Sequence, residues 1–301
     1  MNTDSRLIVI VGPTGCGKTD LSIRLAQHYA APIVSADSRQ IYRGIPIGTA
    51  QPAAEQLAAA EHHFIASHQI TDDFNCGEYE VQALALLGQL FRTHSTVIAV
   101  GGSGLYVQAL CQGMDDLPKA DPELRRQLTL RMEREGIAAL AEELRRLDPD
   151  YYAAVDRSNP ARVQRALEVC IQTGIPYSRQ RSGVRRERPF RIIKIGLQLP
   201  REELYARIDR RVDAMMAEGL EQEARAVYPF RELNSLQTVG YKELFEMFDG
   251  TLTREQAVEL IKRNTRRYAK RQMTWFRRDP QIEWFAPDDT AHIIGHIDGT
   301  R

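Results

Sequence analysis

The chain of 301 residues has few cysteines and no long apolar run. Its four cysteines are scattered without a C-x-x-C pair, which argues against zinc fingers and disulfide frameworks and favours a reducing compartment. The longest early apolar run, Leu7–Val11, is too short for the apolar core of a secretion signal or for a membrane span. We therefore expect a cytoplasmic protein without a membrane segment, acting as a monomer.

The chain also lacks an excess of charge of either sign. Forty basic residues balance forty acidic ones, so any binding to nucleic acid must come from local clustering of cations. With 43% hydrophobic residues, a chain of this length can bury a core and form one large or two smaller domains. Because composition decides no more than this, function has to be sought in the motifs.

The clearest motif is GPTGCGKT, Gly12–Thr19, which matches G-x-x-x-x-G-K-[ST] at every fixed position. It lies between the apolar run Leu7–Val11 and a helical pattern, the context of a phosphate-binding loop. Backbone N–H groups of the loop, the helix N-terminus and Lys18 would hold phosphate, and the Thr19 hydroxyl suits Mg²⁺. A glycine-rich turn that binds nothing is the alternative, and the complete match disfavours it.

Three short apolar runs predict strands: Leu7–Val11, Pro32–Ala36 and Thr96–Val100. Helical stretches near Lys18–Ala30 and Glu78–Thr93 separate them. This alternation predicts an α/β fold with a doubly wound parallel sheet, of the P-loop NTPase type.

In such a sheet the carboxyl ends of the strands lie along one edge, where ligands bind. The segments that follow the three strands are the phosphate loop, Asp-Ser-Arg-Gln-Ile-Tyr at Asp37–Tyr42, and Gly-Gly-Ser-Gly-Leu-Tyr at Gly101–Tyr106. We therefore expect three separated motifs to form one site.

Strand patterns disappear over 119–191, and helical patterns follow each other at Pro122–Glu135, Gly136–Leu147 and Pro160–Gln172. A strand-like run then returns at Ile192–Leu199, with a helix from about Arg201. We predict a first part of the core at 1–118, a helical insertion at 119–191, and completion of the core with basic C-terminal helices at 192–301.

The segment Lys262–Arg278 carries eight basic residues and no acid, with Tyr268, Trp275 and Phe276 between them. A basic helix with aromatic side chains suits RNA, because cations meet phosphates and rings stack on unpaired bases. A solvated helix face whose aromatic residues belong to the core explains the pattern equally well. The sequence alone leaves both interpretations open.

Three polar positions near the expected site allow chemistry, each with a simpler alternative. Asp37 is a candidate general base for an attacking amine, or else an acid that caps a turn or accompanies Mg²⁺. Ser103 offers a hydroxyl to a substrate, or caps the helix Leu105–Gln112. One of Arg207, Arg210 and Arg211 could clamp phosphate, although surface pairing with Asp209 or Asp213 fits each of them better.

Six segments, in their order and spacing, resemble bacterial tRNA dimethylallyltransferases: GPTGCGKT, ADSRQIYRGIPIGTAQP, GGSGLYVQAL, NPARVQRALEV, TVGYKE and KRQMTWFRR. The resemblance runs from Ile8 to about Phe285, and ADSRQIYRG together with GGSGLY is its most specific part. It implies transfer of a dimethylallyl group from its diphosphate to N6 of the adenosine on the 3′ side of a tRNA anticodon. Ser103 stands where the family usually has Thr, which keeps the hydroxyl.

The resemblance also implies roles for individual residues. The catalytic residues would be Asp37, Thr19, Ser103 and Arg211, with Thr19 also at Mg²⁺. Donor diphosphate would bind Gly12, Pro13, Thr14, Gly15, Cys16, Gly17, Lys18 and Thr19. The residues implied in tRNA binding are Asp37, Ser38, Arg39, Gln40, Ser103, Arg125, Ala161, Arg162, Val163, Gln164, Arg165, Gln237, Thr238, Val239, Gly240, Tyr241, Lys242, Lys270, Arg271, Gln272, Met273, Thr274, Trp275, Phe276 and Arg277.

Two other functions remain as alternatives. A nucleotide or small-molecule kinase also uses a phosphate loop with an Asp after the second strand, but it leaves the basic C-terminal helix unexplained. An RNA-binding protein that switches with nucleotide would need no Asp37 and would form no covalent product. The third strand ends in Gly-Gly-Ser instead of the Asp that motor-like P-loop ATPases use for Mg²⁺, which disfavours simple ATP hydrolysis.

Overall fold

The computed structural model describes residues 5–181, 183 and 185–300. The chain divides into two compact units. The core unit comprises Met1–Gln112 and Glu187–Arg301, and the helical unit comprises Gly113–Arg186. Among the described residues, no helix is both long and apolar enough to cross a membrane.

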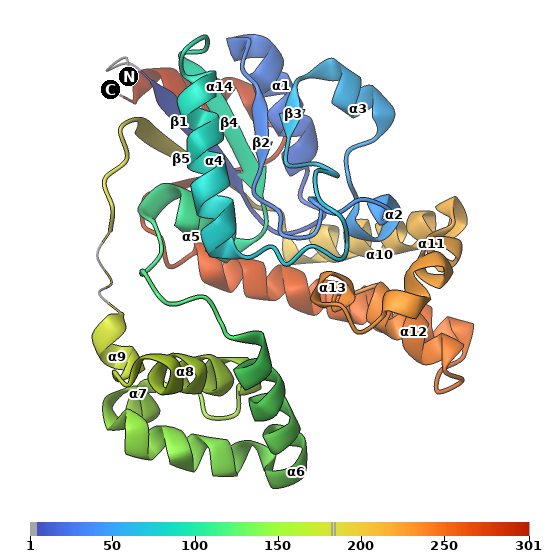
Figure 1. The fold of residues 1–301 in the computed structure, drawn as a ribbon. Helices are drawn as coiled ribbons and strands as arrows, with labels where there is room; N and C mark the ends of the chain where they lie inside the picture. Colours follow the sequence, from blue (N-terminus) through green and yellow to red (C-terminus); the bar gives the residue numbers. More distant parts are fainter. Residues whose placement is uncertain (1–4, 182, 184, 301) are drawn as a thin grey trace. The chain divides into compact units, whose positions relative to one another are not determined.

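The core unit is built on one sheet of six parallel strands in the order β3-β2-β4-β1-β5-β6, shown in Figure 1. The strands are β1 (Arg6–Val11), β2 (Ile33–Ser35), β3 (His62–His63), β4 (Thr96–Gly101), β5 (Arg191–Leu197) and β6 (Ile282–Phe285). The predicted α/β fold with a parallel sheet is confirmed. The sequence pattern missed β3, which has only two residues, and the short edge strand β6.

The central strands β1 and β4 are largely apolar because helices cover both faces of the sheet. Leu7, Val9 and Val11 of β1 belong to one hydrophobic cluster, and the alternate residues Ile8 and Ile10 belong to another. The first cluster includes residues of α4 (Cys76–Leu90) and α5 (Gly104–Gln112). The second includes residues of α1 (Lys18–Tyr29), α10 (Arg201–Glu218) and α14 (Thr290–Gly299). The central strand is therefore buried on both sides.

The long helix α13 (Arg254–Phe276) lies beside α10 and contains most of the predicted basic segment (Figure 1). It begins at Thr253, whose hydroxyl accepts a hydrogen bond from the Gln256 N–H. The remaining helices of the core unit are shorter: α2 (Pro46–Thr49), α3 (Ala54–Ala59), α11 (Leu220–Val227) and α12 (Tyr241–Phe248), with 3₁₀ turns at Tyr228–Phe230 and Asn234–Leu236.

The helical unit consists of α6 (Pro122–Leu147), α7 (Pro149–Ala154), α8 (Pro160–Thr173) and α9 (Tyr177–Gln180). Its first three helices start alike, with Pro at the first position after the capping residues Asp121, Asp148 and Asn159. Gly136, at φ 78°, interrupts α6 and separates the two helical stretches that the sequence predicts there. Leu140, Leu144, Val163 and Leu167 are among the residues that form the unit's own core.

Candidate active site

The phosphate loop links β1 to α1 with the backbone conformation that its glycines predict. Gly12, Gly15 and Gly17 all have positive φ, which glycine adopts without strain. At Gly12 a Cβ atom would also lie 2.7 Å from the Leu197 carbonyl oxygen. Lys18 Nζ donates to the carbonyl oxygens of Gly12 and Pro13, at 3.0 and 2.8 Å. Burial lowers the pKa of Lys18, so its ammonium group gains from an anion in the loop.

Two helices hold Thr14 of this loop. The Thr14 N–H donates to Gln272 Oε1 of α13 at 2.8 Å, and the Thr14 hydroxyl accepts from Arg211 Nη1 of α10 at 3.2 Å. Burial lowers the pKa of Arg211, while the charge of Asp37 opposes this shift. Arg211 is therefore a partly buried cation bonded to the phosphate loop.

The alternative of surface pairing for Arg211 is wrong. Asp209 pairs with Arg266, and Asp213 pairs with Lys262 at 2.8 Å, so both acids are used by α13. Arg207 pairs with Glu203 on its own helix, at 2.7 Å. The geometry separates Arg211, which is bonded to the phosphate loop, from Arg207, which pairs within its own helix, and from the exposed Arg210. The spacing in the sequence could not make this distinction.

Asp37 follows β2 and is anchored by the backbone of its own turn. Its Oδ1 accepts from the N–H groups of Arg39 and Gln40, at 2.9 and 3.3 Å. The turn-capping alternative is therefore realised for this oxygen. Within the described chain no hydrogen bond reaches Oδ2, and the residue lines the cavity beside the phosphate loop. One oxygen of the carboxylate fixes its orientation while the other can meet a substrate.

Ser103 connects the turn after β4 to the turn after β2. Its hydroxyl accepts from the Ser38 N–H at 2.9 Å and donates to the Ser38 hydroxyl at 3.1 Å. The residue precedes α5, as the capping alternative requires, but its side chain bonds across to the other loop. Tyr268 of α13 lies in the same group: burial, followed by the charge of Asp37, raises its pKa to about 12. Its phenol therefore stays protonated at neutral pH. No pattern in the sequence predicts that Tyr268 lies near Asp37.

The three loops border one cavity of about 1340 Å³ in the core unit. This exceeds the roughly 300–1,000 Å³ of a typical small-molecule pocket. The predicted site residues that line it are Thr14, Gly15, Gly17, Lys18, Thr19, Asp37, Ser38, Arg39, Gln40, Arg211, Gln237, Thr238, Val239, Gly240, Lys242, Arg271 and Gln272. The expected convergence of the motifs is thereby observed.

One wall of the cavity is held by an acid that the sequence did not single out. Glu223 of α11 accepts from the N–H groups of Ile47 and Gly48, both at 2.8 Å, and from the Tyr241 hydroxyl at 2.5 Å. A Cβ atom on Gly48 would lie 2.5 Å from the Tyr241 ring, so glycine is needed for this contact. Tyr241 is fully buried, and its side chain is part of the protein core instead of an RNA contact.

Other side chains in the predicted tRNA-binding and diphosphate-binding segments are also core residues. Val163 and Phe276 are buried, and Trp275 packs against Gly104, where a Cβ atom would lie 2.3 Å from the indole nitrogen. The Cys16 side chain is buried beneath the loop, and burial raises the pKa of its thiol. The prediction that Phe276 offers a ring to RNA is therefore wrong, and only the backbone of such positions could contact a ligand.

The basic residues of α13 divide into two sets. Lys262 and Arg266 face α10 and pair with its acids. The exposed set comprises Arg263, Arg267, Lys270 and Arg271, which lie on one face of α13 at spacings of three and four residues from Arg267 or Arg263, and Arg277 and Arg278 at the end of the helix. We call these six cations the basic stripe.

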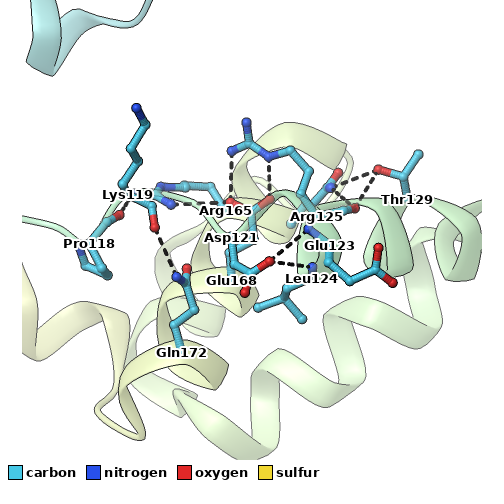
Figure 2. A network of polar contacts seen from close by, with 11 residues as sticks. Pro118, Lys119, Asp121, Glu123, Leu124, Arg125, Thr129, Arg165, Glu168 and Gln172 are labelled. Atoms are coloured by element: carbon cyan, nitrogen blue, oxygen red, sulfur yellow. Dashed lines mark hydrogen bonds and ion pairs between the residues drawn. The ribbon is translucent and has the colours of Figure 1, made fainter. Parts of the chain in front are cut away.

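In the helical unit, the exposed N-terminus of α8 carries Ala161 and Arg162. Two other predicted tRNA contacts, Arg125 and Arg165, converge on the buried carboxylate of Glu168, as Figure 2 shows. Arg125 donates to both oxygens of this carboxylate, at 2.8 and 2.9 Å, and Arg165 donates to it at 3.3 Å and to the Pro118 carbonyl oxygen at 2.7 Å. These arginines therefore hold the helical unit together, whatever else they bind.

We expect Arg125→Ala to lower the free energy of unfolding of the helical unit by about 1–3 kcal/mol, because a buried carboxylate loses its bidentate partner. Arg126→Ala is the matched control: Arg126 pairs with Glu123 at the surface, where an ion pair adds little, so its loss should leave the free energy of unfolding almost unchanged. Urea unfolding followed by circular dichroism measures both. Equal effects of the two substitutions would show that the Glu168 network adds no stability.

Comparison with known proteins shows to which family the chain belongs. The family model described as IPP transferase matches residues 40–279. The chain belongs to the IPP transferase family. It is 50% identical to tRNA dimethylallyltransferase 2 of Parabacteroides distasonis and 54% identical to tRNA dimethylallyltransferase 1 of Phocaeicola vulgatus, each alignment covering 97% of both chains. The resemblance predicted from the motifs is confirmed.

Solved structures agree with this placement. The tRNA isopentenylpyrophosphate transferase of Bacillus halodurans superposes with a TM-score of 0.72 at 37% identity, covering 98% of this chain and 96% of that one. A eukaryotic dimethylallyltransferase acting on tRNA superposes with a TM-score of 0.77 at 27% identity, covering 95% of this chain and 75% of that one. This member of the IPP transferase family therefore shares the fold of solved relatives over nearly its whole length.

Proposed function

We propose that this family member transfers the dimethylallyl group of dimethylallyl diphosphate to N6 of the adenosine 3′ to the anticodon of tRNA, releasing diphosphate. The observation that carries the proposal is the single cavity bordered by the three loops, which Asp37, the phosphate loop and Arg211 all line. The relatives' names support this reaction.

The donor's diphosphate fits the phosphate loop because negative charge grows on it as the bond to the allylic carbon breaks. That charge can be stabilised by the loop N–H groups, Lys18 and Arg211. Such electrostatic stabilisation of the transition state is usually the largest single contribution to catalysis. The Thr14 hydroxyl holds Arg211, and the carbonyl oxygens of Gly12 and Pro13 hold Lys18. Little reorganisation is then needed during the reaction.

Mg²⁺ fits the same place. The Thr19 hydroxyl lines the cavity and is an oxygen ligand of the kind that Mg²⁺ prefers. The described residues contain no group of three or more His, Cys, Asp and Glu side chains able to hold a metal, so diphosphate and water would complete the coordination. When bound, the ion would neutralise part of the leaving group's charge.

The acceptor nitrogen needs orientation and loss of a proton, because an exocyclic amine of adenine is a poor nucleophile. As the nitrogen–carbon bond forms and the carbon–oxygen bond to diphosphate breaks, the N6 proton passes to Asp37. The Ser103–Ser38 contact fixes the turn beside this carboxylate. The protonated phenol of Tyr268 adds a hydrogen-bond donor in the same group.

The tRNA would bind through cations that the protein leaves exposed. The basic stripe supplies these on the core unit, and the start of α8 with Arg162 supplies one on the helical unit. A base in an anticodon loop can be turned out at lower cost than a paired base, and the cavity is large enough to receive it. We propose that the protein does this as a monomer in the cytoplasm.

Mass spectrometry of tRNA after incubation with the protein, dimethylallyl diphosphate and Mg²⁺ tests this function. We expect the tRNA to gain one dimethylallyl group, with an equal amount of diphosphate released. An RNA-binding switch would leave the tRNA unchanged, and a kinase would transfer phosphate from ATP to its acceptor in a parallel reaction. Unmodified tRNA under these conditions would remove the proposal.

The basic stripe should make tRNA binding steeply dependent on salt. Each phosphate contact contributes about 0.7–0.9 to the slope of log K against log salt. Replacing Lys270, Arg271 and Arg277 with Ala should flatten that slope while leaving transfer to saturating tRNA intact, since these residues position the substrate. Filter binding at several salt concentrations measures it. An unchanged slope in a folded triple variant would return the stripe to a merely solvated helix face.

A further inference from the structure

Gln272 of α13 is a polar side chain in the interior of the core unit, with 6% of its surface exposed. Its Oε1 accepts from the Thr14 N–H at 2.8 Å, and its Nε2 donates to the Gly102 carbonyl oxygen at 2.9 Å. One side-chain amide thus joins α13 to the phosphate loop and to the turn after β4. A residue predicted to bind tRNA is instead bonded to two of the three loops of the cavity.

The glycines of the turn after β4 explain how this contact is possible. A Cβ atom on Gly102 would lie 2.2 Å from Gln272 Nε2, so any larger residue would displace the amide. Gly104 makes room for Trp275 of α13 in the same way, because a Cβ atom on Gly104 would lie 2.3 Å from the indole nitrogen. These two glycines flank Ser103, and α13 therefore packs directly on both sides of the residue that contacts Ser38.

The phosphate loop depends on such external contacts. Its glycines allow many backbone conformations, and Thr14 is held by Gln272 on its N–H and by Arg211 on its hydroxyl. A neutral amide suits this position because it can accept from one loop and donate to the other without bringing negative charge to an anion site. A Glu at this position would lose the donor and repel a diphosphate.

We propose that Gln272 is a positioning residue, which sets the phosphate loop and the Ser103 turn for the diphosphate of the donor and does not contact RNA. The identity of the donor rests on the proposed function. The role of Gln272 in positioning the loop does not rest on it, because any ligand with a diphosphate group would bind the same backbone N–H groups of the phosphate loop.

The test compares Gln272→Met with the wild type. Met fills similar space but can form neither hydrogen bond. We expect the Kd for inorganic diphosphate with Mg²⁺, measured by titration calorimetry, and the KM for dimethylallyl diphosphate to rise about ten- to a hundredfold, from two lost hydrogen bonds. The Kd for tRNA and its salt dependence should stay within about twofold of wild type. Gln272→Asn, whose amide is one methylene shorter, serves the same purpose if the Met variant does not fold.

Two further variants separate positioning from stability. Val258→Ala removes packing from the same helix at a partly buried position away from the loop, and should leave diphosphate binding unchanged. Gly102→Ala should reproduce the Gln272→Met defect by displacing the amide, and this effect should largely vanish in a Gln272→Ala background, where the clash is relieved. Additive effects in this cycle would show that the two residues act independently, against the proposal.

The outcomes distinguish the inference from the proposed function. A weaker tRNA affinity with unchanged diphosphate binding in Gln272→Met would make Gln272 an RNA contact and overturn the inference. A wild-type protein that binds diphosphate but forms no prenylated tRNA would remove the proposed function, while the calorimetry still decides the role of Gln272. A wild type that binds no diphosphate would overturn the inference itself.

Discussion

Asp37→Asn should lower the single-turnover rate of prenyl transfer by about 10²–10⁴, the range expected for loss of a general base. Asn keeps an acceptor at Oδ1 for the Arg39 and Gln40 N–H groups, so the turn after β2 should persist. It can no longer take the N6 proton. Because a base acts mainly in the transition state, tRNA affinity should stay within a few-fold of wild type.

Asp156→Asn is the matched control for this substitution. Asp156 also accepts from a backbone N–H two residues on, that of Ser158 at 3.1 Å, but it lies in the helical unit. Its replacement should leave the rate of transfer unchanged. Should Asp37→Asn retain a rate within about threefold of wild type, Asp37 would be a capping residue and the base would have to be sought elsewhere.

Arg211→Met should reduce kcat/KM for dimethylallyl diphosphate by about 10²–10³, as expected when a preorganised group that stabilises developing charge is removed. The guanidinium is partly buried and is bonded to Thr14, which fixes its position beside the phosphate loop. Methionine fills much of the same space, which limits the packing cost. Titration of the donor at saturating tRNA measures the effect.

Arg210→Met is the control from the same helix, because Arg210 is exposed. Its replacement should change kcat/KM for the donor less than about twofold. If the two variants lost activity equally, the orientation of Arg211 toward the loop would have no catalytic meaning. Loss of tRNA affinity with donor kinetics intact would instead assign Arg211 to RNA binding.

The parts of the site that could be predicted are those with a local cause. The phosphate loop follows from glycines and a Lys between a strand and a helix, and its convergence with Asp37 and Ser103 follows from the parallel sheet. Strands buried on both faces are apolar throughout, so β1 and β4 were clear, whereas β3, with two residues, leaves no pattern.

The parts that could not be predicted depend on contacts between distant residues. Gln272 meets Thr14 across most of the chain, and Glu223 reaches back to Ile47 and Gly48. No local periodicity predicts such pairs. Gly48 and Gly102 are the only hints of these contacts in the sequence, because each glycine makes room for a side chain from a distant part of the chain. The sequence does not show which side chain that is.

Motif segments also mix residues with different roles because a helix alternates its faces. Within Lys270–Arg277, the side chains of Lys270, Arg271 and Arg277 are exposed, while Gln272 and Phe276 are buried. A contiguous segment that the resemblance assigns to tRNA therefore contains both an exposed face and the core that supports it. Only the structure separates the two.

The most direct test of the central claim is nucleoside analysis by mass spectrometry of tRNA treated with dimethylallyl diphosphate and Mg²⁺, using wild type and Asp37→Asn in parallel. A second tRNA, with guanosine in place of the adenosine 3′ to the anticodon, serves as control. We expect wild type to form one N6-dimethylallyl adenosine at that position. Almost none should form with Asp37→Asn or with the guanosine tRNA. Modification at another nucleoside, or equal product from Asp37→Asn, would contradict it.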